Sequence, residues 1–236
     1  IPVSSSSHLI LISNYISFDN QNLSIDISLH IGSFFAVITF FHKDILSFLK
    51  NRALFFKIII SSLPVLLFGY IMVQTNLIDQ LRNIKVIAWT TIIFGILLYI
   101  SDKSKLENKI DNKFNLKTAL IIGLFQVLSL IPGVSRSGIT ITAGRLLNFK
   151  RYDSAKISFL LSVPTLGAIS IYGLRNIIIS EDLNFSILNF ISIILSFLFS
   201  YLTIKYFIKF IENFSLKLFV IYRIFLGSML LVLIYL

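Results

Sequence analysis

Two short stretches of the sequence combine a proline, several hydroxyls and a basic residue within apolar surroundings. They read IPVSSSSHLIL, at residues 1–11, and IPGVSRSGITI, at residues 131–141. In the first, a hydroxyl at Ser5 and an imidazole at His8 would share a helix face, three residues apart. Such a pair is the minimal arrangement for nucleophilic or general acid–base catalysis.

The second stretch is suited to binding an anion. A helix that starts after Pro132 would present unpaired N–H groups and about half a positive charge at its N-terminus. Arg136 adds a guanidinium whose planar fork matches phosphate oxygens, and it would share a helix face with Thr140. The neutral hydrogen-bonding groups that we expect around the anion are Ser4, Ser135, Ser137 and Thr140.

Structural roles are the simpler interpretation for other polar residues. Serine runs in membrane helices often bond to their own backbone carbonyls. We assign His30, Gln126 and Arg223, which lie within or near apolar segments, to packing or interfacial roles. Arg136 resists this interpretation, because an unpaired arginine at bilayer depth costs at least about 2.5–3.5 kcal/mol.

The composition indicates a membrane protein. Of the 236 residues, 56% are hydrophobic and 14% are charged, whereas soluble domains have about 25% charged residues. The absence of cysteine excludes disulfides and thiolate metal sites. The net charge of +10 is explained by basic cytoplasmic loops, so we expect no nucleic-acid partner.

Apolar runs of about 20 residues, long enough to cross the hydrocarbon, predict an all-α polytopic integral membrane protein with about six full spans. Leu116–Ile131 and Val134–Phe149 are too short to span comfortably, and Pro132-Gly133 between them predicts a re-entrant helical hairpin. Residues from Pro2 to about Ser17 look like the second half of another such hairpin, whose first half is truncated. The expected spans are Leu54–Val73, Ile84–Ile100, Ile157–Leu174, Phe185–Ile204 and Leu218–Leu236, with a shorter one at Ile27–Phe41.

The distribution of basic residues supports this topology. Four connections, 43–57, 101–117, 145–156 and 205–217, hold 16 of the 21 Lys and Arg residues, so we place them in the cytoplasm. Two full spans in place of the re-entrant hairpin would satisfy the same charges. The spans alone therefore leave both topologies open.

The two proline turns also indicate an internal repeat. Repeats that enter from opposite faces, with broken half-helices that meet near the midplane, are typical of inverted-topology membrane folds. We predict a single membrane domain, 1–236, with pseudo-repeats at about 1–100 and 117–236 joined by the cytoplasmic loop 101–116.

At these motifs the sequence resembles the undecaprenyl-diphosphate phosphatases. IPVSSSSHLIL is similar to their first signature, a Pro-Val-Ser-Ser run that ends in a His. QVLSLIPGVSRSGITI is similar to their second, Pro-Gly-x-Ser-Arg-Ser-Gly. The resemblance continues through LHIGSFFAVITFFHKDI, SFLLSVPTLGA and FVIYRIFLG, and so covers essentially the whole chain.

This resemblance implies a multi-pass enzyme of the bacterial inner membrane whose active site faces the periplasm. It would hydrolyse the terminal phosphate of undecaprenyl diphosphate, which recycles the carrier lipid for peptidoglycan synthesis and confers bacitracin resistance. Ser5 would be the nucleophile and His8 the proton carrier, with a phosphohistidine at His8 as the open alternative, and Arg136 would hold the diphosphate. The implied partners are this lipid and the membrane lipids, and a homodimer is left open.

Two departures from the family pattern concern the chemistry. The family carries a pair of glutamates just upstream of its first signature, and these would help bind a divalent cation, magnesium or calcium. No acidic residue of this chain can be placed at the site, so we expect an upstream segment with the glutamates and no metal ligand within residues 1–236. Ser7 also replaces the usual glycine before the His, and its side chain would crowd the phosphate.

Three other functions compete with this interpretation. A transporter or flippase of an anionic polyprenyl lipid would share the inverted repeat and the broken helices. A phosphatase of the lipid-phosphate type would need a further His after the Ser-Arg, and none follows His42. A purely structural protein would leave Arg136 unexplained.

Overall fold

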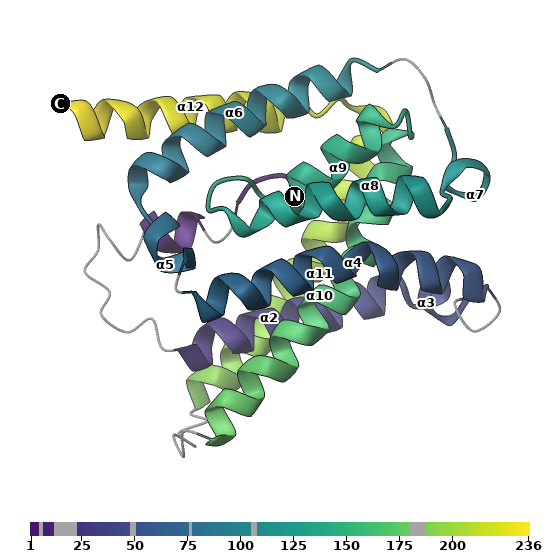
Figure 1. The fold of residues 1–236 in the computed structure, drawn as a ribbon, viewed down its shortest axis with the longest axis horizontal. Helices are drawn as coiled ribbons and strands as arrows, with labels where there is room; N and C mark the ends of the chain where they lie inside the picture. Colours follow the sequence, from purple (N-terminus) through teal and green to yellow (C-terminus); the bar gives the residue numbers. More distant parts are fainter. Residues whose placement is uncertain (5–6, 12–22, 48–50, 76, 105–107, 180–186) are drawn as a thin grey trace.

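A computed structural model describes most of the chain as a bundle of helices (Figure 1). Within the described part, the one strand-like contact is an isolated pairing of Asn108 with Phe149. The described residues are 1–4, 7–11, 23–47, 51–75, 77–104, 108–179 and 187–236. In this part, five helices are long and apolar enough to cross a membrane: α4 (Arg52–Gln74), α6 (Ile84–Asp102), α10 (Arg151–Ile179), α11 (Ile187–Asn213) and α12 (Lys217–Tyr235).

These five helices confirm the all-α polytopic fold and the five long spans that the sequence predicts. The sixth span corresponds to α2 (Leu23–Phe40), a helix of 18 residues. At 1.5 Å per residue it is about 27 Å long, slightly less than the hydrocarbon core of about 30 Å. It is thus the shortest of the six, as its sequence predicts.

The predicted re-entrant hairpin consists of α8 (Leu116–Val127), a short 3-10 turn (Leu128–Leu130), the Pro132-Gly133 turn and α9 (Arg136–Leu146). With 12 and 11 residues, α8 and α9 are each less than about 20 Å long, too short to cross the bilayer. They lie side by side in Figure 1.

Both ends of this hairpin lie together. The backbone N–H of Asn108, before α8, donates to Asn148 O at 2.7 Å, and the N–H of Lys150, after α9, donates to Asn108 O at 3.0 Å. The tip instead reaches into the bundle, where Thr90 Oγ1 donates to Pro132 O at 2.6 Å. Because Thr90 is the seventh of the 19 residues of α6, the tip lies inside the bundle and the alternative of two full spans is wrong.

The four basic connections gather at one end of the bundle. Figure 1 shows α3 (His42–Ser47) and α7 (Ile110–Lys113) at this end, and α5 (Leu77–Leu81) at the other. Lys156 Nζ lies 2.6 Å from Asp44 Oδ1, which joins two of the connections. The clustering that the charges predict is therefore present in the fold.

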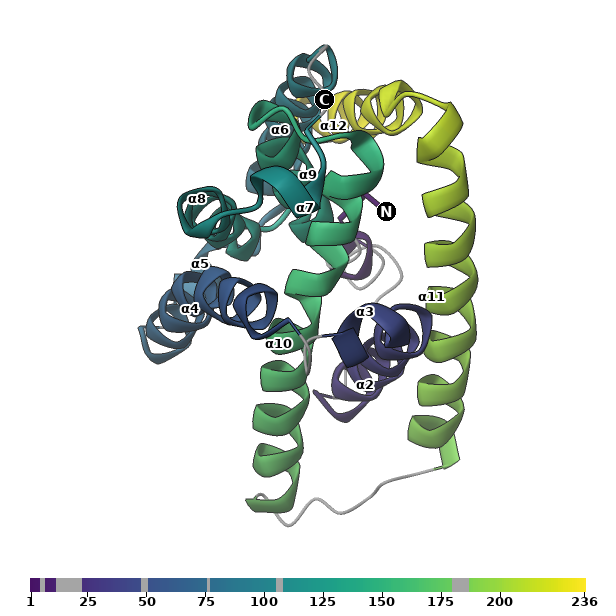
Figure 2. The same ribbon diagram turned by 90° about the vertical axis from the view of Figure 1, so that its right-hand side faces the viewer.

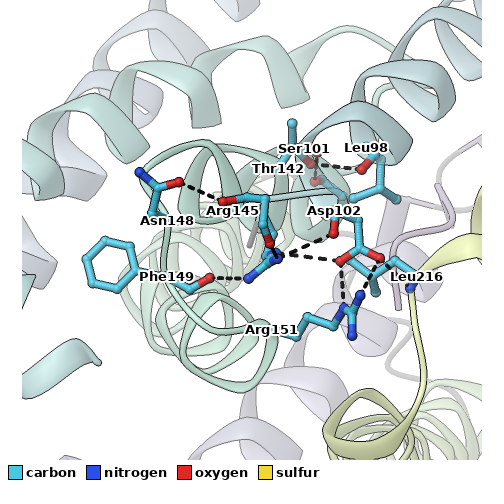
Figure 3. Close-up of polar contacts among 11 residues, drawn as sticks. Leu98, Ser101, Asp102, Thr142, Arg145, Asn148, Phe149, Arg151 and Leu216 are labelled. Carbon is cyan, nitrogen blue, oxygen red and sulfur yellow. Dashed lines mark hydrogen bonds and ion pairs between the residues drawn. The ribbon is translucent and has the colours of Figure 1, made fainter. Parts of the chain in front are cut away.

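A buried carboxylate, Asp102, ties the other connections together (Figure 3). Arg151 Nε donates to its Oδ1 at 2.7 Å, and the N–H of Leu216 donates to its Oδ2 at 3.0 Å. Arg145 Nε lies 3.5 Å from Oδ1, and both Asp102 and Arg145 are less than a tenth exposed. One side chain thus holds three segments that are far apart in the sequence.

Helices from the two halves of the chain pack against one another. Figure 2 shows α2 between α10 and α11, and α6 packs against both α9 and α12. Glycines permit close approach of the backbones: a Cβ at Gly227 of α12 would lie 2.9 Å from Ala88 O of α6, and one at Gly32 of α2 would overlap Ile193 O of α11. The predicted pseudo-repeat symmetry stays a prediction.

Candidate active site

The second motif forms a sharp turn against α6. Gly133 has φ +92°, a conformation that L side chains rarely adopt. An added Cβ would overlap Thr90 Oγ1 and lie 2.8 Å from Ile87 O. Glycine is therefore required twice at this position, once for the backbone conformation and once for the contact with α6.

Ser135 starts α9 in a strained conformation. It is a non-glycine residue with φ +69°, and such residues concentrate at functional sites. Its Oγ accepts a hydrogen bond from the N–H of Gly138 at 3.3 Å, which caps the helix. The first N–H groups of α9, those of Arg136 and Ser137, have no acceptor within the helix. The tip therefore carries the helix N-terminus that the sequence predicts, and its binding of an anion stays a prediction.

Arg136 is half-buried next to α10. Its Nη1 donates to Thr165 Oγ1 at 2.9 Å. Within the described ranges, no carboxylate lies within 4.0 Å of this guanidinium. A cation held by a neutral hydroxyl, beside a helix N-terminus, favours an anionic ligand.

The first motif arranges its described polar residues around His8. Ser7 Oγ donates to Ser4 Oγ at 2.9 Å, and both serines are buried. His8 Nδ1 lies 2.6 Å from Ser4 O, and its Nε2 lies 2.6 Å from the hydroxyl of Tyr222 in α12. Ser5, the predicted nucleophile, lies outside the described residues, so its role stays a prediction.

The two motif segments touch each other. Ser137 Oγ, in the first turn of α9, donates to Ile1 O at 2.7 Å. The first segment then leads away from the basic end, because Leu11 packs with Ile87, near the start of α6, and with Leu230, near the end of α12. The described part of the first segment thus runs away from the end at which the second hairpin begins, and the inverted repeat stays a prediction.

Thr140, which is predicted to bind the substrate, and Ser7, which is predicted to crowd it, are both almost completely buried. Thr140 is 1% exposed, and its Oγ1 lies 2.8 Å from Arg136 O and 2.7 Å from Ser158 Oγ. A bond from Thr140 to substrate would require this hydroxyl to change partners. Ser7, at 1% exposed, turns its hydroxyl toward Ser4.

Arg223 of α12 is closer to the site than its assignment to a packing or interfacial role implies. Only 1% exposed, it donates from Nε to Thr91 O at 3.2 Å and from Nη2 to Gly133 O at 2.9 Å. Its Nη1 has no partner among the described residues, and it would lie 2.9 Å from a Cβ at Gly138. The signal in the sequence was the charge itself, since a basic residue within a span is a functional candidate by default.

The described residues do not provide a site for a divalent cation. Within the described part of the chain, no group of three His, Asp or Glu side chains is placed to bind a metal. The buried carboxylate of Asp102 is occupied by two arginines at the basic end of the bundle.

The fold and the site define an α-helical polytopic membrane protein with a short helical hairpin, whose tip carries a helix N-terminus and the guanidinium of Arg136. Residues 1–229 match the sequence model described as bacitracin resistance protein BacA, and the chain belongs to this family.

Curated relatives cover the whole length of the chain. It is 50% identical over 237 residues to the undecaprenyl-diphosphatase of Pelagibacter ubique (strain HTCC1062), and the aligned region covers 100% of this chain and 92% of the relative. The undecaprenyl-diphosphatase of Jannaschia sp. (strain CCS1) is 36% identical, over 100% of this chain and 93% of its own. That of Saccharophagus degradans (strain 2-40 / ATCC 43961 / DSM 17024) is 38% identical, over 97% and 90%.

Proposed function

We propose that this protein is an undecaprenyl-diphosphate phosphatase. It hydrolyses the terminal phosphate of undecaprenyl diphosphate to give undecaprenyl phosphate and inorganic phosphate, recycles this carrier lipid for peptidoglycan synthesis and confers bacitracin resistance. The observation that carries the proposal is the contact between the two motif segments, at Ser137 Oγ and Ile1 O, next to the guanidinium of Arg136, which bonds the neutral hydroxyl of Thr165. Family membership and the names of the relatives support it.

The diphosphate binds at the start of α9 in this proposal. Arg136 is the first residue of this helix, and its guanidinium and the N–H groups of the first turn both favour a group with two or more negative charges. Because these donors are fixed before substrate arrives, they also stabilise the charge that builds up on the transferring phosphoryl group.

The reaction breaks the bond between the terminal phosphorus and the bridging oxygen. A nucleophile forms a new bond to this phosphorus, and undecaprenyl phosphate leaves with the electron pair of the broken bond. Water then releases the phosphate from the nucleophile. Ser5, with His8 as proton carrier, and His8 itself stay the two proposed nucleophiles.

The imidazole of His8 is oriented for either role. A carbonyl oxygen only accepts hydrogen bonds, so at 2.6 Å from Ser4 O the Nδ1 atom carries the hydrogen. In the neutral ring, Nε2 then holds a lone pair, which can take a proton or attack phosphorus once the hydroxyl of Tyr222, 2.6 Å away, releases it.

The divalent cation implied by the resemblance, magnesium or calcium, stays a proposal without a site in the described residues. Removing divalent cations with a chelator and restoring them, with phosphate release as the readout, tests this part of the proposal separately.

The site faces the periplasm of the inner membrane in this proposal. The basic end lies in the cytoplasm by the positive-inside rule. Thr90, which bonds the tip, is six residues from the opposite end of α6, about 9 Å, and twelve residues from the basic end, about 18 Å.

A homodimer is the remaining proposal, and the mass of the solubilised protein tests it.

Phosphate release from undecaprenyl diphosphate by the purified full-length protein tests the function. Release that depends on Arg136 supports the phosphatase. Unchanged lipid, together with movement of the lipid between the leaflets of vesicles, would establish the transporter instead.

A further inference from the structure

His8 is fixed by two hydrogen bonds and one ring contact. Its Nδ1 lies 2.6 Å from Ser4 O, and its Nε2 lies 2.6 Å from Tyr222 Oη. The imidazole and the phenol ring are stacked, with centroids 5.9 Å apart and an interplanar angle of 11°. Since Nδ1 donates to the carbonyl, Nε2 of the neutral ring accepts, and the hydroxyl of Tyr222 is the donor.

Tyr222 is itself held in place by its neighbour. Arg223 follows it on α12 and donates to Thr91 O of α6 and to Gly133 O of the second tip. These two bonds limit the rotation and the sliding of α12 against α6. Consecutive residues of one helix thus contact both tips, Tyr222 the first and Arg223 the second.

An ordinary lipid-facing tyrosine would not show this geometry. Tyr222 is 40% exposed, as an interfacial aromatic residue often is, but its hydroxyl is bonded to a titratable ring nitrogen. Tyr235, on the same helix, is 68% exposed, and its ring faces Lys85 with the ammonium 5.9 Å from the ring centroid. Tyr235 therefore shows what an α12 tyrosine does without a partner at the tips.

We propose that Tyr222 is a positioning residue for the phosphatase reaction, acting through His8. Its hydroxyl and ring keep the imidazole in the orientation with hydrogen on Nδ1 and the lone pair on Nε2. Because the one lone pair of Nε2 accepts this bond, the hydroxyl of Tyr222 turns aside when Nε2 takes a proton from the nucleophile, and the protonated Nε2 then donates to Tyr222 Oη. This inference rests on the proposed function and on His8 as the proton carrier, because attack of Nε2 on phosphorus would use the lone pair that accepts the hydrogen bond from Tyr222.

Kinetics of Tyr222→Phe and Tyr222→Leu provide the first test, with the purified full-length protein and undecaprenyl diphosphate. Phe keeps the ring and removes one hydrogen bond, so we expect kcat to fall about three- to tenfold with KM within twofold. Leu also removes the stacking, so kcat falls about a further three- to tenfold. Tyr235→Phe is the matched control and keeps the wild-type kcat.

The nitrogen resonances of His8 provide a second test that a merely structural role would not change. The chain has three histidines, so replacing His30 and His42 by Gln leaves His8 as the only imidazole signal. In this background, Tyr222→Phe shifts the 15N resonance of Nε2, whereas Tyr235→Phe does not.

The outcomes separate this inference from the proposed function. If the wild-type protein releases no phosphate, the function is wrong. If it does, and Tyr222→Phe has wild-type kcat and KM or leaves the Nε2 resonance unchanged, the role of Tyr222 is wrong. A rise in KM with unchanged kcat would also overturn it, because Tyr222 would then bind substrate.

Discussion

Replacing Gly133 by Ala tests whether the conformation of the second tip controls activity. The new methyl group would occupy a residue with φ +92°, which costs about 1–2 kcal/mol for an L side chain. It would also overlap Thr90 Oγ1 and lie 2.8 Å from Ile87 O, and overpacking of this kind costs about 1–3 kcal/mol. The two costs together come to about 2–5 kcal/mol.

The turn relieves this cost by moving away from α6. Movement breaks the bond from Thr90 Oγ1 to Pro132 O and displaces Ser135 and Arg136, which follow the turn directly. If the active arrangement must be restored for each turnover, even about 2 kcal/mol lowers kcat/KM roughly 30-fold. Phosphate release from undecaprenyl diphosphate measures this loss, with the membrane-inserted protein quantified in parallel.

A matched control is available in α4. A Cβ at Gly69 would lie 3.5 Å from Leu130 Cδ2, an ordinary contact, so Gly69→Ala keeps kcat/KM within about twofold. Thr90→Ala combined with Gly133→Ala removes one of the two overlaps and recovers part of the loss. If Gly133→Ala alone has a kcat/KM within threefold of the wild type, the argument from the tip geometry is wrong.

Three further substitutions test other parts of the structure. Arg136→Ala lowers phosphate release more than about 100-fold while membrane insertion is retained, because it removes the charge that we propose binds the diphosphate. Near-normal turnover would refute this role. Asp102→Ala removes the carboxylate next to the buried Arg145 and lowers the free energy of unfolding by about 3–5 kcal/mol, while kcat of the folded protein is unchanged. An unchanged melting temperature in detergent would contradict this prediction. Arg223→Lys keeps the charge but cannot bond Thr91 O and Gly133 O in the same geometry, so kcat/KM falls about three- to tenfold. An equal loss in Arg223→Met and Arg223→Lys would show that the charge alone does not contribute.

The helices could be predicted because hydropathy and length are local properties. Apolar runs of membrane length become α4, α6, α10, α11 and α12, and the proline-glycine turn becomes the tip of a short hairpin. The largest difference lies at the end of α11, which continues nine residues beyond the predicted span, and α10 begins six residues before its own. Charged residues continue the helix there because Arg151 and Lys156 find carboxylates at the basic end.

The contacts that organise the site could not be predicted in the same way. His8 and Tyr222 are 214 residues apart, and only the packing of α12 brings them together. The bond from Arg223 to Gly133 O likewise depends on the depth and rotation of one helix against another. Residue types identified Arg136 and His8 as candidates, because a charge or an imidazole in an apolar segment needs a reason.

The hydrogen bond from Arg223 to Gly133 O has a consequence for biogenesis. The arginine is synthesised 90 residues after the carbonyl that it serves. When α8 and α9 have been synthesised but α12 has not, the donor for this carbonyl is therefore still missing. An unsatisfied carbonyl in hydrocarbon costs several kcal/mol. We therefore expect the hairpin to reach its final depth only after the last helix has left the ribosome and joined α6.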